Sequence, residues 1–549
     1  MKSHINENIL KKSISKPITW WSFGLLSIAI VLVFVFPEVS AHYIGKTRTA
    51  ITAYMTWYFT LLATSALIFC IWLAFSKYGK IRLGGDNAKP EYSNFAWYSM
   101  LIACGEGVGL IFWGIAEPLL LFGDSKFAEP KSAEAISSSI EWSYFHWGVH
   151  AWAIYCIVAV VLAFSIHNCN KPLNFHNAIS DMFPTVWRAP VSITVEVIAI
   201  ITTVLGLATS FGFAALQFNT GLNFAFGIDI SVSFQMAFMV AIAGMTILSQ
   251  RKGLNKGMRL ISETNSWLSI VLLSVFFIFG PTIYIISLFF ETVGTYLSSL
   301  FAMGLWNDSY SFIGGVGAWN ESWMGNWTTF IWCWGAFSFA PFVAAFIAKV
   351  SRGRTIKEFL IGGIAGPSLI VMVWVVINGG TAIATDILVG GIVDATQANP
   401  AAGLFTTIEK FSYEWITPIL SIVAIVLIAT FYITSLDGGT YSLSSMLHEE
   451  KEGKASQNAG SKYRIGLSLM ITVVASVLLL AGGTTVLASL QTGAMIAAVP
   501  FSVVAILGVV NLVRRLKLYE SGLDTVDSEK KLEAEKSEGA PDCSLVRYD

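Results

Sequence analysis

Long apolar stretches recur along most of the chain, and polar residues gather in the short segments between them. A helix needs about 20 mostly apolar residues to cross the hydrocarbon core of a bilayer. Because backbone groups in lipid must satisfy their own hydrogen bonds, these stretches predict a bundle of membrane-spanning helices. Twelve spans are predicted, at residues 18–37, 51–76, 94–122, 138–166, 188–218, 230–249, 264–297, 326–348, 359–385, 411–446, 462–482 and 485–512.

The third stretch contains the segment ACGEGVGLIFWG, which begins at Ala103. Three glycines at every second position weaken any helix there, and Glu106 stands between the first two. An ionisable residue within a span is costly and usually faces an interior cavity. Since broken helices at mid-membrane depth mark transporter binding sites, Glu106 is the first candidate site residue.

The fourth stretch contains FHWGVHAWAIY, in which Trp147, Trp152 and Tyr155 fall roughly within one stripe of a continuous helix. On spacing alone, such a row is more often packing than a ligand site. Beside a carboxylate-bearing broken helix, its electron-rich ring faces suit a methylated ammonium group. His146 and His150 lie one turn apart, but no third ligand is evident, so a metal site is not favoured.

The tenth stretch ends in FYITSLDGG. Phe431, Thr434 and Ser435 place a backbone carbonyl and two hydroxyls on one helix face, and hard cations bind oxygens of this kind. The same hydroxyls also bond to helix carbonyls, so this pattern alone does not establish an ion site. Other ionisable residues within spans are Glu117, expected near the outer end of its span, Glu141, Glu196 and Asp437.

Composition agrees with a membrane protein and limits the function. The 549 residues are 55% hydrophobic and 13% charged, whereas about a quarter of a soluble domain is charged. The formal net charge of −1 gives no reason to expect nucleic acid as a partner. The spans contain no nucleophile–base pair and the six cysteines have no metal-ligand spacing, so an enzyme is not expected.

Lysine and arginine predict the orientation. They cluster before the first span, after the second, sixth and eighth, and after the twelfth, while the segments between are nearly free of them. Because positively charged loops stay on the cytoplasmic side, both termini are expected in the cytoplasm.

Four stretches together resemble the betaine/carnitine/choline transporter family. They are CGEGVGLIFWGIAEP at 104–118, HWGVHAWAIY at 146–155, WTTFIWCWGAFSFAPFVAAFIAKVSRGRTIKEF at 327–359 and TSLDGG at 434–439. The similarity covers about residues 18–515. It implies a multi-pass protein of the bacterial inner membrane, in contact with lipid and usually a homotrimer.

The resemblance also implies an all-α fold with a ten-helix inverted-repeat core, spans 3–12, preceded by two peripheral helices. Its segments are a cytoplasmic tail at 1–17, the peripheral helices at 18–93, the first repeat at 94–300, an outer amphipathic connection at 301–325, the second repeat at 326–512 and a cytoplasmic tail at 513–549.

The site implied by the resemblance has two parts. An aromatic cage would use Trp147, Trp152 and Tyr155. The eighth span would add Trp334 and Trp332, with Phe339 as an alternative to them. A sodium ion would be held by the backbone carbonyls of Ala103, Glu106 and Phe431 and the hydroxyls of Thr434 and Ser435.

Two departures from the family pattern refine the function. Betaine carriers usually have methionine where this chain has Glu106, and choline carriers commonly place an acidic residue a few positions later, at Gly109 here. A buried carboxylate repels the carboxylate of betaine and favours a cation. A second sodium site in some members uses two hydroxyls of the fifth span; Thr203 matches one, but Leu207 replaces the other, so one sodium is expected.

The predicted function is therefore sodium-coupled uptake of a small methylated ammonium cation, as in the bacterial trimethylamine transporters, with choline as the next candidate. One alternative is a carrier of zwitterions such as glycine betaine, carnitine or dimethylsulfoniopropionate. Another is a proton-coupled amine carrier in which Glu106 takes the proton. An ion channel is less favoured, since aromatic residues around a site suit occlusion better than conduction.

Overall fold

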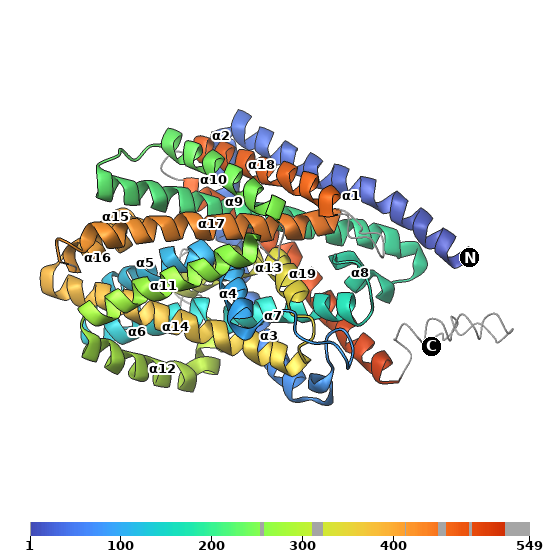
Figure 1. Cartoon of the computed structure of the whole chain (residues 1–549), viewed down its shortest axis with the longest axis horizontal. Coiled ribbons are helices and arrows are strands. Elements are labelled where there is room, and N and C mark those ends of the chain that lie inside the picture. The colour runs from blue at the N-terminus through green and yellow to red at the C-terminus, as the bar shows by residue number, and fades with distance from the viewer. Residues whose placement is uncertain are drawn as a thin grey trace.

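The computed structural model of the chain describes residues 2–252, 257–309, 322–411, 413–447, 457–482 and 486–521. These residues form an elongated bundle in which most long helices run along the long axis (Figure 1). No strand forms among them, although an isolated antiparallel bridge joins Arg82 to Thr355.

The first half of the chain forms α1 (Lys2–Val35), α2 (Pro37–Tyr54), α3 (Thr56–Phe75), η1 (Lys77–Lys80), α4 (Asn94–Gly105), α5 (Gly107–Gly123), α6 (Ala133–Trp147), α7 (Val149–His167), α8 (Phe175–Ile179), η2 (Ser180–Met182), α9 (Thr185–Phe226), α10 (Val232–Lys252), α11 (Arg259–Phe279) and α12 (Thr282–Leu305). The second half forms η6 (Gly325–Thr329), η7 (Trp332–Phe337), α13 (Ala340–Val350), α14 (Ile356–Val389), α15 (Ile392–Ala398), α16 (Ala402–Phe411), α17 (Thr417–Leu447), α18 (Gln457–Gly482) and α19 (Val486–Glu520).

Ten of the described helices are long and apolar enough to cross a membrane, and two bent helix pairs raise that number to as many as twelve. One pair is α4 with α5, bent by 69°, and the other is the η6–η7 segment with α13, bent by 47°. They are the third and eighth predicted spans, which begin the two expected repeats. Broken helices at matching places in two halves are typical of inverted-repeat transporters. The prediction of an all-helical membrane protein is confirmed.

One predicted span is wrong. The sequence predicted a single helix over 264–297, but the structure has two helices there, α11 and α12, separated by Gly280 and Pro281. Proline has no N–H to donate, and it disfavours helical backbone in the residue before it. Gly280 accordingly ends α11 in an extended conformation, with φ −86° and ψ −172°.

The limits of other segments also differ from the prediction. Helix α1 begins at Lys2 and α19 continues to Glu520, so both predicted tails are partly helical. The predicted connection at 301–325 is partly α12, which ends at Leu305, and residues 310–321 lie outside the described residues, as does the tail from 522. Helix α18 matches the predicted span 462–482, but its apolar run is short.

The fourth predicted span is interrupted by a glycine. Helix α6 ends at Trp147 and α7 begins at Val149, with Gly148 between them at φ −95° and ψ −125°. Trp147 and Trp152 therefore lie on two consecutive helices, which together form one candidate span, Ala133–His167. An ideal Cβ on Gly148 would collide with the carbonyl oxygen of Tyr144, so this junction requires glycine.

Helices α6 and α7 form the centre of the bundle. Of their most apolar stretch, 89% is buried, compared with 17% for α1 and 22% for α12. The outer helices expose large apolar side chains such as Trp20 and Phe290. A soluble protein rarely exposes so many apolar groups, whereas lipid covers them without cost.

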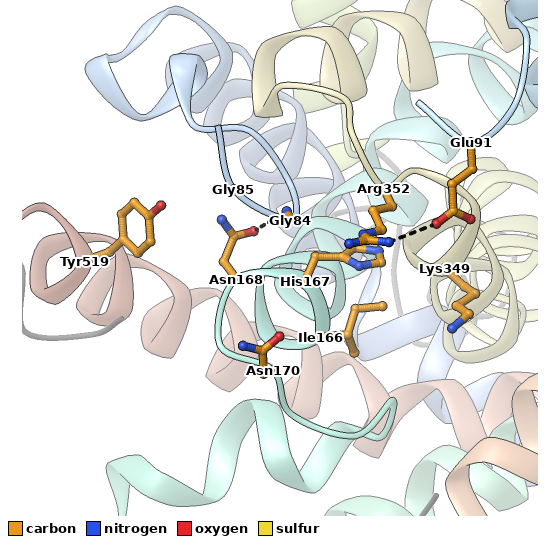
Figure 2. A pocket seen from close by; sticks show the side chains of 10 residues that line it. All are labelled: Gly84, Gly85, Glu91, Ile166, His167, Asn168, Asn170, Lys349, Arg352 and Tyr519. Atoms are coloured by element: carbon orange, nitrogen blue, oxygen red, sulfur yellow. Dashed lines mark hydrogen bonds and ion pairs between the residues drawn. The ribbon is translucent and has the colours of Figure 1, made fainter. Parts of the chain in front are cut away.

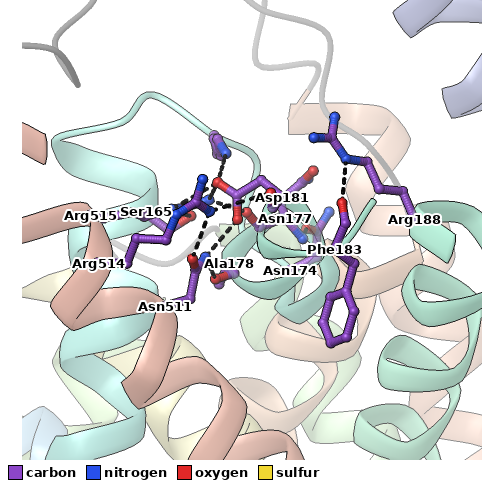
Figure 3. Close-up of polar contacts among 11 residues, drawn as sticks. Ser165, Asn174, Asn177, Ala178, Asp181, Phe183, Arg188, Asn511, Arg514 and Arg515 are labelled. Carbon is purple, nitrogen blue, oxygen red and sulfur yellow. Dashed lines mark hydrogen bonds and ion pairs between the residues drawn. The ribbon is translucent and has the colours of Figure 1, made fainter. Parts of the chain in front are cut away.

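Charged residues fasten one end of the bundle (Figure 3). Arg515 of α19 donates to the carboxylate of Asp181 at 2.7 and 3.1 Å, and Lys171 reaches it at 3.1 Å. Asn511 donates to the other carboxylate oxygen at 2.6 Å. Burial alone would raise the pKa of Asp181, but the charges of Arg515 and Lys171 outweigh it and lower that pKa to about 2. The carboxylate thus ties α19 to the α8–η2 segment.

Candidate functional site

The third span breaks at Glu106. Helix α4 ends at Gly105 and α5 begins at Gly107, and only Glu106 lies between them. Gly107 has a φ of +34°, a backbone conformation that residues other than glycine rarely adopt. The predicted break is present, but it is narrower than the alternation of glycines suggested.

Glycine lets other side chains approach the break closely. A Cβ at position 105 would lie 2.8 Å from Cη2 of Trp152, and one at position 107 would lie 2.7 Å from Oγ of Ser435. Each distance is shorter than a real Cβ contact. The glycines therefore bring a cage indole and a candidate sodium ligand against the broken backbone.

The carboxylate of Glu106 is buried and has no partner. Neither of its oxygens accepts a hydrogen bond, and it forms no ion pair with any described residue. The indole N–H of Trp152 approaches the carboxylate without completing a hydrogen bond, and it too has no other partner. Because buried polar groups almost always have partners, this carboxylate is suited to a ligand that brings positive charge or a donor.

The structure brings four of the predicted rings together near the break. The rings of Trp147 and Trp334 are 5.7 Å apart, and those of Trp152 and Tyr155 are 5.5 Å apart. The Tyr155 hydroxyl donates to the carbonyl of Gly335 at 2.6 Å, and a Cβ on Gly335 would lie 3.3 Å from Trp147. Gly335 thus connects the two ring pairs.

Trp332, also predicted for the cage, lies elsewhere. It stacks on His150 with the ring centres 5.6 Å apart, and no described ring contact joins it to the other four. Trp334 instead contacts Trp113 at 5.8 Å and Phe213 at 5.1 Å. The sequence did not reveal these two residues, because η7 is a π-helix whose register its apolar run does not predict.

Two of the candidate sodium ligands, Ser435 and Ala103, meet at the break. Oγ of Ser435 lies 3.4 Å from the carbonyl oxygen of Ala103, and Oγ1 of Thr434 lies 2.9 Å from that of Phe431. The carbonyl of Glu106 accepts a hydrogen bond from the first turn of α5. One oxygen of α4 and one of α17 therefore lie close together, and oxygens of this kind suit a hard cation. The contact between Thr434 and Phe431 lies within α17, where a threonine hydroxyl commonly bonds to a helix carbonyl.

The fifth span shows why one sodium was expected. The hydroxyl of Thr203 donates to the carbonyl of Ala199 at 2.8 Å. Leu207 packs so closely on Gly439 of α17 that a Cβ there would collide with it. An apolar side chain fills the space that a second hydroxyl would need.

Glu117 was expected near the outer end of its span, but it is fully buried. Its carboxylate binds His146 at 2.5 Å and Trp147 at 2.6 Å. The histidines at 146 and 150 do not act as a pair, since the first binds Glu117 and Thr328 while the second stacks on Trp332. The described residues contain no cluster of three or more His, Cys, Asp or Glu that could hold a metal.

Asp437 has a partner that the sequence did not reveal. Its carboxylate forms a buried ion pair with Arg464 of α18 and accepts a hydrogen bond of 2.9 Å from Ser249 of α10. The pair links three helices near the end of the bundle that carries the basic loops. Each oxygen of this carboxylate has a partner, and neither partner is a cage residue.

A polar pocket of about 500 Å³ opens at the same end (Figure 2). Arg352 faces Glu91 at 3.4 Å on one side, and Asn168 faces the backbone of Gly84 on the other. None of the cage residues lines it. The four rings of the cage are at most 4% exposed, so they lie in the interior of the bundle.

Comparison with known proteins agrees with this architecture. The family model described as BCCT, betaine/carnitine/choline family transporter, matches residues 17–521. The glycine betaine transporter OpuD of Bacillus subtilis (strain 168) is 32% identical over 90% of this chain and 93% of its own length. The ectoine/hydroxyectoine transporter of Virgibacillus pantothenticus is 33% identical over 92% and 97%.

A high-affinity choline transport protein of Escherichia coli (strain K12) is 28% identical over 94% of this chain and 74% of its own length. The family match spans all of the described membrane helices. The chain therefore belongs to the betaine/carnitine/choline transporter family, and it is a multi-pass membrane transporter, not an enzyme.

Proposed function

We propose that this transporter carries a small methylated ammonium cation into the cell together with sodium. Trimethylammonium is the preferred substrate and choline the next. The single observation that carries the proposal is the carboxylate of Glu106, which is buried beside aromatic rings and has no partner.

Charge favours a cation over a zwitterion. A substrate carboxylate held about 5 Å from Glu106 would be repelled by about 3 kcal/mol at an effective dielectric constant of about 20, which lowers affinity about a hundredfold. A methylated ammonium group without a carboxylate gains a counter-charge. The rings of Trp147, Trp152, Tyr155 and Trp334 supply cation–π contacts.

The relatives differ in what their names say they carry, which includes glycine betaine, ectoine and choline. Family membership alone therefore does not choose among cations and zwitterions. The buried carboxylate of Glu106 supports a cation, because it would repel the carboxylate of a zwitterion.

Sodium is proposed as the coupling ion because neutral oxygens of α4 and α17 lie close together at the break, next to Glu106. Sodium there would fix the broken backbone that positions the carboxylate. One sodium and one organic cation move two charges inward. At about 2.3 kcal/mol per charge per 100 mV, the membrane potential contributes roughly 4 to 5 kcal/mol to uptake.

The proposed setting is the bacterial inner membrane, with both termini in the cytoplasm and a homotrimeric assembly surrounded by lipid. Alternating access is part of the proposal, and the burial of the cage rings supports it. The ends of α7, α13 and α19, which surround the polar pocket of Figure 2, would face the cytoplasm.

A proton-coupled carrier is the second candidate, and the same observation favours it. A desolvated carboxylate without a partner is also a group that takes up a proton readily. In that case Glu106 would alternate between proton and substrate, and sodium would be dispensable.

Uptake of radiolabelled trimethylamine into proteoliposomes separates the candidates. The proposal predicts uptake with an inward sodium gradient at every pH between about 6 and 8, and little uptake when potassium replaces sodium. Equal uptake in potassium, driven by an inward proton gradient, would replace sodium coupling with proton coupling. Uptake of glycine betaine but not of trimethylamine would remove the proposed substrate.

A further inference from the structure

A second buried glutamate, Glu117, lies on α5 and has hydrogen-bond partners at both carboxylate oxygens. Its side chain is fully buried, and both carboxylate oxygens accept hydrogen bonds. Oε1 lies 2.5 Å from Nδ1 of His146, and Oε2 accepts the indole N–H of Trp147 at 2.6 Å. Both distances are short for N–H···O hydrogen bonds, and bonds to a charged acceptor are shorter than those to a neutral one.

The partners satisfy one another completely. Nε2 of His146 lies 2.8 Å from the hydroxyl of Thr328. A neutral imidazole that donates from Nδ1 to Glu117 and accepts at Nε2 from the Thr328 hydroxyl uses every polar atom. With the imidazole in this form, both oxygens of the Glu117 carboxylate accept hydrogen bonds in a buried setting.

Trp147 differs from the other cage tryptophans. The indole nitrogens of Trp152 and Trp334 have no hydrogen-bond partner, whereas that of Trp147 donates to an anion. The far edge of the same indole lies against Gly335 and Gly109, beside the broken helix. One end of this ring is therefore held by Glu117 while the other borders the proposed substrate site.

We propose that Glu117 is a positioning residue of the substrate cage: its carboxylate fixes the indole of Trp147 and strengthens the attraction of that ring for a cation. The inference rests on the proposed function. Glu117 itself does not touch the substrate in this account and acts through the indole.

The physical reason lies in the N–H···O⁻ bond. A carboxylate that accepts a hydrogen bond from the indole N–H polarises the N–H bond and leaves more negative charge on the ring. The cation–π attraction is electrostatic and follows the negative charge of the ring face. The bond also selects one rotamer of an otherwise mobile side chain, which reduces the entropy lost on binding.

The experiment must separate an effect on the charge of the Trp147 ring from an effect on folding. A carboxylate that only binds His146 would also stabilise the fold. Choline and its uncharged carbon analogue 3,3-dimethyl-1-butanol have the same shape, and only choline is a cation. A loss of packing affects both probes, while a loss of ring charge affects choline alone.

The test measures binding of both probes to the purified full-length protein in sodium, for the wild type, Glu117→Gln, Trp147→Phe and the double variant. Glutamine keeps one acceptor for the indole and loses the charge. Glu141→Gln is the matched control, since Glu141 binds only Thr295 among the described hydrogen bonds and lies on α6 outside the cage. It should leave both affinities unchanged.

We expect Glu117→Gln to weaken choline binding about tenfold and binding of the uncharged analogue less than twofold. In the Trp147→Phe background, which has no N–H to donate, the same change should weaken choline binding less than twofold. Such coupling is what a double-mutant cycle detects. If Glu117→Gln does not fold, Trp147→Phe alone should still weaken choline more than the analogue.

Equal losses for the two probes, or a tenfold loss that persists in the Trp147→Phe background, would overturn the inference. If wild-type protein binds choline and Glu106→Gln abolishes that binding, an unaffected Glu117→Gln removes only this inference. If the wild type binds no choline in sodium, or Trp147→Phe binds choline like the wild type, the cage of the proposed function fails as well.

Discussion

Glu106 and Glu117 stand eleven positions apart in one broken span, and their surroundings are opposite. Both side chains are buried. Glu117 accepts hydrogen bonds from His146 and Trp147, whereas Glu106 accepts none. The carboxylate of Glu117 therefore contributes to the packing of the helices, whereas the carboxylate of Glu106 has no partner among the described residues.

Hydrogen-bond partners help to distinguish a structural charge from a candidate substrate-binding charge inside a membrane protein. A buried charge without partners costs several kcal/mol, so a fold keeps one only where a ligand or a proton compensates it. Burial alone would have ranked the two glutamates equally. Their hydrogen-bond partners distinguish the two residues and predict that they respond differently to mutation.

The largest effect is expected from Glu106→Gln. Loss of the counter-charge should lower the affinity for trimethylammonium about a hundredfold, from an interaction of about 3 kcal/mol. Thermal unfolding should not become easier, because an unpartnered charge is removed from the interior. Calorimetric binding and a melting curve in detergent measure the two quantities, and unchanged affinity would remove Glu106 from the site.

Glu117→Ala should give the reverse pattern. It leaves the N–H groups of His146 and Trp147 buried without an acceptor, and breaking such a buried pair costs roughly 3 kcal/mol of stability. Glu106→Ala is the paired control and should cost less, because it removes a buried charge that has no partner. Equal melting temperatures for the two variants would contradict the distinction drawn here.

A smaller effect is expected at the sodium ligands beside Glu106. Ser435→Ala should weaken the sodium dependence of uptake about tenfold, since one oxygen of the proposed set is lost. Ser442→Ala on the same helix is the control, because its hydroxyl bonds to the carbonyl of Phe342 at 2.9 Å and lies outside the proposed set. The half-saturating sodium concentration distinguishes the two variants. If it shifts in Ser442→Ala alone, sodium does not bind at the proposed ligands.

The smallest effect concerns a third kind of carboxylate, the partly exposed and fully paired Asp181. Its pKa falls from an ordinary value near 3.8 to about 2, so its charge stabilises the fold above pH 4. That contribution is lost as pH falls from about 4 to 2. Asp181→Asn should cost about 1 kcal/mol near neutrality, and the cost should vanish below pH 2. A pH series of melting temperatures checks this, and an undiminished difference at pH 2 would refute it.

Much of the fold followed from the sequence, because helix length and apolarity are local properties. The break at Glu106 was predicted from alternating glycines, and Trp147, Trp152 and Tyr155 were predicted from residue type. The Gly280–Pro281 pair also indicates the division of 264–297 into two helices, but the long apolar run led to the prediction of one helix.

The partners of the buried charges could not be predicted in this way. Glu117 and His146 lie on different spans, and Asp437 and Arg464 on different helices, so each pair depends on how helices pack. The same holds for Trp334, whose direction is set by a π-helix. Sequence patterns indicate which residues are costly to bury, and packing decides which of them are compensated.

The most direct test is calorimetric titration of the purified wild-type protein, in sodium, with trimethylammonium and with glycine betaine. An unpartnered carboxylate in the cage predicts that trimethylammonium binds at least about a hundredfold more tightly than glycine betaine. Glycine betaine binding equally well, or better, would contradict the selection of cations by Glu106.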